Sequence, residues 1–218
     1  MASPVSILSI QCGQVRPFRG PDEHSAIGKE PVAGPVRVHR LGLEGDVQAD
    51  LAVHGGPDKA IHHYPHDHYR FWRGAIGDHP LLADFGAFGE NIATEGMTEE
   101  TVCLGDRYRL GSALVEVSQG RQPCWKLDHR FDGQPVNARM VKARNPGWYY
   151  RVLEEGEVTA GDMIELLDRP HREWTIARAF GLLIAGDHKR DREGLEALGA
   201  LDVLAEPWRK RQRQLLGI

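Results

Sequence analysis

The sequence predicts a mainly β fold with helices, namely a barrel or sandwich followed by a small helical appendage. Short β-branched segments separated by glycine turns fill the first two-thirds of the 218 residues,. That strand pattern disappears after Asp168-Arg169-Pro170. Short strands at close spacing are typical of barrels and sandwiches whose ends are covered by helices. We therefore divide the chain into a β domain, residues 1–168, and a C-terminal extension, residues 169–218.

Several segments predict the strands of the β domain. Residues 5–10 and 36–39 are rich in β-branched side chains, which favour extended backbone,. Residues 106–110 and 113–117 flank the pair Gly111-Ser112. Glycine at the first turn position suits the mirror-image turns that match the twist of paired strands, so this region is predicted to form a β-hairpin.

Helices are predicted at three places. The first begins near Pro65, a residue tolerated in a first helical turn, and runs toward Gly77,. The second follows Asn145-Pro146 and ends at Gly156. From residue 173 onward only helical patterns remain, in an extension too small to hold a large core alone,. We expect the extension to pack against the β domain or to contact a partner.

Composition excludes several classes of protein. The chain is 41% hydrophobic and 27% charged, which is ordinary for a soluble globular protein,. Its net charge of −4 gives no electrostatic reason to expect binding to nucleic acid or to acidic membranes,. No apolar run approaches the roughly 20 residues of a membrane span. The N-terminus lacks the basic and apolar regions of a signal peptide, so we expect a cytoplasmic protein,.

The three cysteines, Cys12, Cys103 and Cys124, are odd in number and far apart. This usage fits a reducing compartment without a disulfide framework. There is no Cys-x-x-Cys pair, and there are too few cysteines for the four-thiolate set that holds an iron–sulfur cluster,. If the protein is a redox enzyme, its electrons are expected to come from another protein.

Cys124 is the residue that most clearly points to chemistry. It follows a predicted strand, with Arg121 three residues before it and Lys126 two after. Nearby cations lower a thiol pKa, and the thiolate is the form that binds metals or attacks electrophiles. The alternative is a buried structural thiol. A cysteine hydrolase would need a partner histidine, for which His129 and His54 are candidates,.

Two glycine-containing segments are candidate ligand loops. In residues 45–60, Gly55-Gly56 frees the backbone to approach a ligand, and turn amides of this kind can bind anions,. His54 and Lys59 flank the glycines and are placed to contact a phosphate or a polar ring. In residues 85–92, a side-chain amide and a carboxylate could offer hydrogen-bond donors and acceptors to a heterocyclic ligand,. In each case the alternative is an ordinary surface loop.

Histidines are concentrated in residues 62–68. His62 and His66 have the spacing that can place two metal ligands on one helical face. However, Pro65 lies between them, and no glutamate completes a His-Glu-x-x-His pattern,. We therefore expect an exposed, polar start of a helix rather than a metal site.

Taken together and in this order, these motifs resemble the MOSC-domain family, in particular its YiiM-like branch. The resemblance runs through residues 45–50, 54–60, 88–92, 105–106 and 118–127. It covers most of residues 1–168, and the tail resembles the three-helix extension of that branch. One departure is Gly120, since the family commonly has proline just before the arginine. The resemblance implies a MOSC-type β-barrel followed by a small three-helix bundle.

The resemblance also implies that the barrel binds a molybdenum–pyranopterin, the molybdenum cofactor. Cys124 would be the catalytic residue and would supply the protein thiolate to the metal. A soft thiolate suits a metal already bound by dithiolene sulfur. Arg121 and Lys59 are candidates for the cofactor's phosphate or oxo groups. The full set of expected cofactor-binding residues is His54, Gly55, Gly56, Lys59, Asn91, Ser118 and Arg121.

The activity implied for the YiiM-like branch is reduction of N-hydroxylated compounds such as 6-hydroxylaminopurine. Oxygen would pass from the N–OH group to reduced molybdenum held by Cys124, releasing the amine. An external flavin- or iron–sulfur-containing reductase would return the electrons, and no nucleic acid or membrane partner is expected. A homodimer is left open. The alternatives are a non-catalytic carrier of molybdenum cofactor or metal–sulfur fragments and, third, a cysteine hydrolase.

Overall fold

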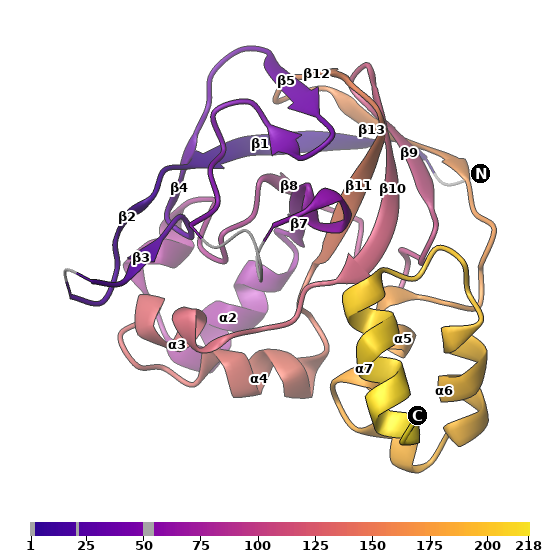
Figure 1. Cartoon of the computed structure of the whole chain (residues 1–218). Coiled ribbons are helices and arrows are strands. Elements are labelled where there is room, and N and C mark those ends of the chain that lie inside the picture. Colours follow the sequence, from indigo (N-terminus) through magenta and orange to yellow (C-terminus); the bar gives the residue numbers. More distant parts are fainter. Residues whose placement is uncertain (1–2, 21, 50–54) are drawn as a thin grey trace.

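A closed seven-stranded β-barrel forms the centre of the protein (Figure 1). The computed structural model describes residues 3–20, 22–49 and 55–218. The first and last strands of the barrel pair with each other and close it. Strands β7 and β8 are parallel, and the other neighbouring pairs are antiparallel. In spatial order the barrel strands are β1 (Val5–Gly13), β8 (Ile92–Thr94), β7 (Ile61–Pro65), β11 (Trp148–Glu154), β10 (Ala113–Gly120), β9 (Arg107–Leu110) and β13 (Met163–Asp168).

Short strands lie at the edges of the barrel. One of them, β4 (Lys29–Pro31), pairs with the far end of β1. The others form a three-stranded sheet and a two-stranded ribbon. They are β5 (Val36–His39), β6 (Gly42–Leu43) and β12 (Gly156–Val158) in the sheet, and β2 (Arg16–Pro17) and β3 (His24–Ser25) in the ribbon.

Helices form two groups outside the barrel (Figure 1). The first group is α2 (His68–Ile76), α3 (Trp125–Arg130) and α4 (Val136–Ala143). The second, in the C-terminal extension, is α5 (Ile176–Leu183), α6 (Arg192–Gly199) and α7 (Glu206–Leu216). Single 3-10 turns are η1 (Pro57–Lys59), η2 (Pro80–Ala83) and η3 (Asp187–Lys189). Within the described residues, none of the helices has the length and apolar character needed to cross a membrane.

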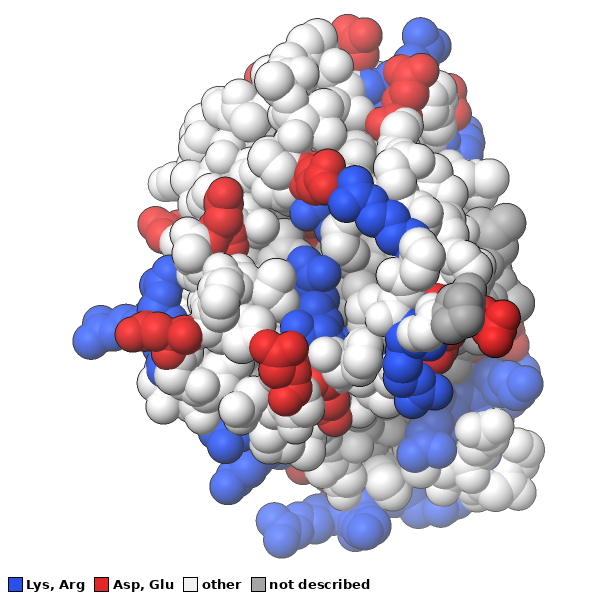
Figure 2. Space-filling view, turned by 90° about the vertical axis from the view of Figure 1, so that its left-hand side faces the viewer, with Lys and Arg blue, Asp and Glu red and all other residues white. Residues whose placement is uncertain are grey.

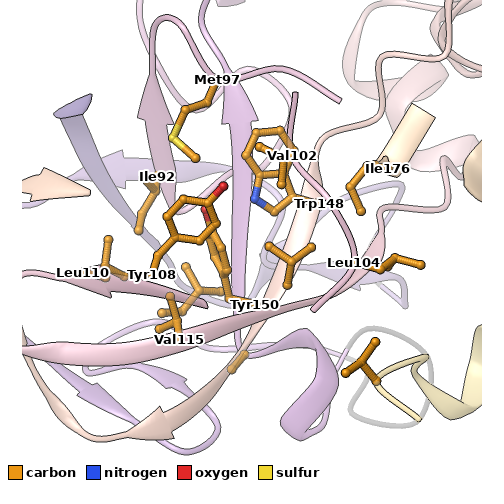
Figure 3. Close-up of a cluster of buried hydrophobic side chains, with 14 of the residues drawn as sticks. Ile92, Met97, Val102, Leu104, Tyr108, Leu110, Val115, Trp148, Tyr150 and Ile176 are labelled. Carbon is orange, nitrogen blue, oxygen red and sulfur yellow. The ribbon is translucent and has the colours of Figure 1, made fainter. Parts of the chain in front are cut away.

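One hydrophobic core runs from the barrel into the extension. Inside the barrel, Tyr108, Trp148 and Tyr150 gather with aliphatic side chains from the neighbouring strands (Figure 3). The same cluster continues through Ile176 to Trp208. A second, aromatic cluster centred on buried Phe88 packs α2, α3 and α4 against the loop that precedes β8. The extension therefore packs against the β domain and shares its core, which is one of the two roles that the sequence left open for it.

The structure confirms the predicted hairpin and the strands at residues 5–10 and 36–39, but the helix predicted after Pro146 is wrong. Residues 148–154 form β11, paired with both β10 and β7. Its side chains alternate between buried and half-buried positions, the period-2 pattern of a strand,. Its aromatic residues fit a pleated surface better than a helix. Likewise, Pro65 ends β7 rather than beginning a helix, and α2 starts three residues later.

Gly120 lies where the barrel meets the extension, at a position that leaves little room for a side chain. It is the last residue of β10, and a Cβ there would lie 2.8 Å from Trp208 Cη2 and 3.2 Å from Ile176 Cγ2. A proline ring in its place would meet the same indole. Glycine in place of the family's usual proline therefore makes room for the large side chain that α7 packs against this strand.

We predict that Gly120→Ala lowers the free energy of unfolding by about 1–3 kcal/mol, because an added methyl group overpacks this contact. The measurement is chemical denaturation of both proteins. Gly74→Ala is the matched control, since nothing lies near its Cβ position in α2. That control should gain about 0.5–1 kcal/mol. Equal stability of Gly120→Ala and the unmodified protein would contradict the packing argument.

Candidate functional site

A cleft beside Cys124 collects basic side chains from distant parts of the chain. It lies between the 3-10 turn η1, the loop before β8, the turn after β10 and strand β11. Its basic residues are Lys29, Lys59, Arg121 and Lys126. Among the described residues that line it there is no aspartate or glutamate. Figure 2 shows Lys and Arg side chains near the middle of one face of the protein, with acidic side chains above and below them. The cleft suits an anionic ligand.

Cys124 lies in the turn that joins β10 to α3, where the sequence predicts it. It is half-buried and lines the cleft with Arg121 and Lys126. The other two cysteines do not line the cleft as far as it is described. Burial and the neighbouring carboxylates of Asp46 and Asp106 raise the pKa of Cys12 and of Cys103 to about 11, so both are held as thiols,. Only for Cys124 does the location favour metal or ligand chemistry.

Arg121 is a buried cation without a carboxylate partner among the described residues. The residue is 6% exposed, and its guanidinium contacts Met140 Sδ at 3.6 Å. Arg151, by contrast, bonds Asp58 Oδ1 at 2.8 Å and Glu116 Oε1 at 3.0 Å. Burying a charge without a partner of opposite sign is costly, and an anionic ligand in the cleft would lower that cost.

Asn91 lines the cleft but its amide is already engaged. Nδ2 donates to Gln11 O at 3.1 Å and to Asp46 Oδ2 at 2.9 Å, while Oδ1 accepts from His62 N at 2.9 Å. Asp46 Oδ2 also pairs with Lys29 Nζ at 2.6 Å. For the predicted contact with a pterin, Asn91 thus has one lone pair of Oδ1 left to accept a hydrogen bond. Asn91 braces Asp46, which in turn positions Lys29, a cleft residue that sequence analysis missed.

Ser118 and the glycine loop lie at the edge of this arrangement. Ser118 is buried, outside the described lining of the cleft, with Oγ 2.6 Å from Asp58 O and 3.1 Å from Tyr149 O. It therefore holds the turn that carries Lys59. Gly56 precedes that turn with φ of 99°, a conformation that favours glycine,. Gly55 and Gly56 are absent from the described lining, and His54 lies outside the described residues.

Two other motif residues have structural roles. Glu90 is fully buried and accepts from Tyr69 OH at 2.6 Å and from the backbone amides of Gly86 and Phe88. Its carboxylate shapes the loop rather than facing a ligand. Asp106, also fully buried, pairs with Arg169 Nη2 at 2.6 Å. The Gly105-Asp106 motif thus anchors the segment that leads into the extension.

The expectation that residues 62–68 form an exposed helix start is wrong for His62 and His63. Both are buried in β7, between β8 and β11. His62 lines the cleft, with Nδ1 3.3 Å from Gly89 O and its ring 5.0 Å from the ring of Tyr149. His63 lies 3.0 Å from Tyr150 OH and 2.8 Å from Thr94 Oγ1. Burial on both faces of a central strand overrides their polar character.

The histidines also bear on the hydrolase alternative. Burial, and then the charge of Arg121, hold the pKa of His62 well below 6.5. His129 Nε2 lies 3.2 Å from Phe18 O, and this residue is not part of the described cleft lining. Within the described residues, no cluster of three His, Cys, Asp or Glu side chains forms a separate metal site. As far as the described histidines go, the cleft favours an anionic ligand over a cysteine–histidine pair.

Comparisons with known proteins agree with the fold. The family model described as "MOSC domain" matches residues 50–165. The chain is 45% identical to protein YiiM of Escherichia coli over 145 residues, covering 66% of this chain and 65% of that protein. It is 40% identical over 175 residues to a protein of Gibberella moniliformis named "Reductase", covering 79% of this chain and 31% of that protein. The crystal structure of YiiM from Geobacillus stearothermophilus superposes with a TM-score of 0.81, at 33% identity, covering 98% of this chain and all of that one.

The buried histidines predict a loss of stability in mild acid. Burial lowers the pKa of His63 to about 3, against 6.5 in an unfolded chain. Below pH 6.5 the unfolded chain therefore binds more protons, and stability falls as the pH drops from 6.5 toward 3. Between pH 6.5 and 5, His63 alone should cost on the order of 2 kcal/mol. Denaturation at the two pH values measures this, and imidazole NMR shifts should show neutral His62 and His63 at pH 5. A protonated His63 at pH 5 would contradict the assignment.

Because Arg121 has no carboxylate partner among the described residues, we predict that its removal stabilises the ligand-free protein. Arg121→Met should raise the free energy of unfolding by about 1 kcal/mol, since a buried charge is replaced by an apolar side chain of similar length. Arg151→Met is the matched control and should lower it by about 2 kcal/mol, because Asp58 and Glu116 lose their partner,. Thermal and chemical denaturation would check both. Destabilisation of Arg121→Met as large as in the control would reveal a structural role.

Proposed function

Because the chain belongs to the MOSC-domain family and resembles its YiiM-like members over nearly its whole length, we propose that it is a molybdenum-cofactor-dependent reductase of N-hydroxylated compounds. The observation that carries the proposal is that one basic cleft is lined both by Cys124 and by Arg121, a buried cation without a carboxylate partner among the described residues. The relative named "Reductase" supports the reaction class.

The residues of the cleft fit the cofactor. Its metal is already bound by dithiolene sulfur and could take one further thiolate, which Cys124 would offer from the turn after β10,. Its phosphate is anionic, and Arg121 has the planar donor geometry that suits phosphate oxygens. Lys59 lines the same cleft, on a turn held by Ser118 and by the Arg151–Asp58 pair. The cofactor's charges would thus meet basic side chains, with no described carboxylate in the cleft lining to oppose them.

The protein's own groups would bind and orient the reactants. When bound, the cofactor would supply the two electrons that cleave the N–O bond. Balanced overall, R–NH–OH, two electrons and two protons give R–NH₂ and water. Tyr149 lines the cleft, and burial keeps its pKa above the usual value, so its hydroxyl stays protonated at neutral pH,. It is therefore a candidate to donate a hydrogen bond to the substrate's oxygen.

The electrons are proposed to come from a separate flavin- or iron–sulfur-containing reductase, since the chain has too few cysteines to hold such a cluster itself,. Protein alone with NADH should not turn over, whereas a chemically reduced electron donor should support conversion of 6-hydroxylaminopurine to adenine. Turnover with NADH and no second protein would overturn this part. Bound molybdenum without turnover would favour a cofactor carrier instead.

We predict that Cys124→Ser loses molybdenum. Elemental analysis after expression in a host that makes the cofactor should give near-stoichiometric metal in the unmodified protein and a decrease of more than about tenfold in the variant, because the softer ligand is lost. Cys103→Ser is the control, since this buried thiol lies outside the described cleft lining. It should keep its metal.

The same metal measurements can refute the proposed site at Cys124. Equal metal in Cys124→Ser and the unmodified protein would remove Cys124 from the ligand set. Unmodified protein without metal or pterin, from a host shown to load a control enzyme, would remove the cofactor hypothesis. Cys124 would then be open to the thiol chemistries.

A further inference from the structure

A second cavity reaches Cys124 from the side of the C-terminal extension. It has a volume of about 170 Å³ and is distinct from the basic cleft, although Lys59, Cys124 and Tyr149 line both. Figure 1 shows the start of α7 beside the end of β10. The remaining walls come from the end of β10, the turn that follows it and the first turn of α7, and they are Gln119, Gln122, Pro123, Pro207 and Trp208. Cys124 therefore lies on the wall of two spaces.

The second cavity opens to solvent at one end. Gln122 and Pro207, which we call its rim, are exposed. Gln119 and Trp208, in contrast, are each 2% exposed. The cavity thus runs from the surface into the protein. A molecule that passes the rim meets the half-buried Cys124 on the cavity wall.

The two spaces differ in charge. The cleft is lined by four basic residues, Lys29, Lys59, Arg121 and Lys126, whereas Lys59 alone is basic among the described residues that line the second cavity. An anion with several charged groups is therefore favoured in the cleft. When the cofactor's phosphate occupies the cleft, the second cavity stays available for the other reactant.

We propose that N-hydroxylated substrates reach Cys124 through the second cavity, and that its rim limits the size of the group that enters. The inference deepens the proposed function and rests on it for the reaction that follows. A cavity of about 150 Å³ is large enough for benzene. A space of about 170 Å³ therefore admits an N–OH group carried on a chain or on one ring, while any bulkier part of the substrate stays outside the rim.

The docking of the extension sets the width of this passage. One side of the rim belongs to α7, and Trp208 Cη2 of that helix lies 2.8 Å from the position that a Cβ of Gly120 would take. Just before α7 begins, Ala205 N donates to Ser118 O at 3.4 Å. Gln122, on the other side of the rim, follows directly after the end of β10. Because both sides are held against the same strand, the extension takes part in selecting substrates by size.

The first test follows the thiol of Cys124 in the cofactor-free full chain, with inorganic pyrophosphate present to fill the basic cleft. Iodoacetamide is the probe, since it is small and uncharged and alkylates thiolates. Gln122→Trp narrows the rim by changing only an exposed residue. Alkylation of Cys124, measured by peptide mass spectrometry, should slow about tenfold, because the indole must move aside before the reagent passes. Gln122→Ala, which widens the rim, should react at least as fast as the unmodified protein.

Gln214→Trp is the matched control. Gln214 is an exposed glutamine near the other end of α7, outside the described lining of the cavity. The same substitution there should leave the alkylation rate of Cys124 unchanged. Cys12 and Cys103 serve as internal references, because the pKa of each is raised to about 11 and neither lines the described part of the cavity.

The second test measures selection by size in the molybdenum-loaded protein with a chemically reduced electron donor. Gln122→Trp should lower kcat/KM for 6-hydroxylaminopurine about tenfold, since its ring must pass the narrowed rim. Reduction of hydroxylamine to ammonia should change less than about twofold, because this substrate is small enough to pass. The molybdenum content should equal that of the unmodified protein.

Three results would overturn the proposed passage: unchanged alkylation in Gln122→Trp, equal slowing in Gln214→Trp, or equal loss of kcat/KM for both substrates. The alkylation test needs no metal. Slower alkylation in Gln122→Trp, together with an unmodified protein that never acquires molybdenum, would refute the proposed reductase and leave the passage to Cys124 standing. Turnover of both substrates without any effect of Gln122→Trp would do the reverse.

Discussion

The arrangement of the whole site depends on one guanidinium. Arg151, on β11, bonds Asp58 in the turn that precedes the barrel strand β7, Glu116 on β10 and the carbonyl of Val203 in the extension. These groups belong to parts of the chain more than 140 residues apart at the extremes. Because the planar donor set of arginine satisfies several acceptors in fixed directions, one side chain sets the relative positions of the turn, the barrel and the extension.

Arg121 differs from Arg151 in its ion pairing. Its charge is buried without a carboxylate partner among the described residues, while the charge of Arg151 is doubly paired. A protein selected for stability alone would replace or pair such a group. Its position beside Cys124 fits a site in which an anionic ligand would balance the charge.

Motif residues of the chain fall into two kinds once their contacts are known. Cys124, Arg121 and Lys59 line the cleft. Glu90 and Asp106 are fully buried and bind backbone amides or an arginine. Both kinds occur in the same short motifs, because a loop that presents a ligand-binding side chain needs polar groups of its own to hold its backbone. Sequence pattern alone does not separate the two.

The sequence by itself determined the hairpin, the early strands, the helical extension and the turn that carries Cys124, because turn glycines, β-branched runs and helical periodicity are local signals. Tertiary structure decided the rest. The Trp148–Glu154 segment forms a strand, and His62 is a buried residue that lines the cleft. Strand pairing on both sides of β11 and β7 outweighed the local conformational preference of these residues,. Lys29 and Tyr149 joined the cleft because strands from distant parts of the chain pair in the barrel. Such contacts between distant residues leave no mark in the local order of the chain.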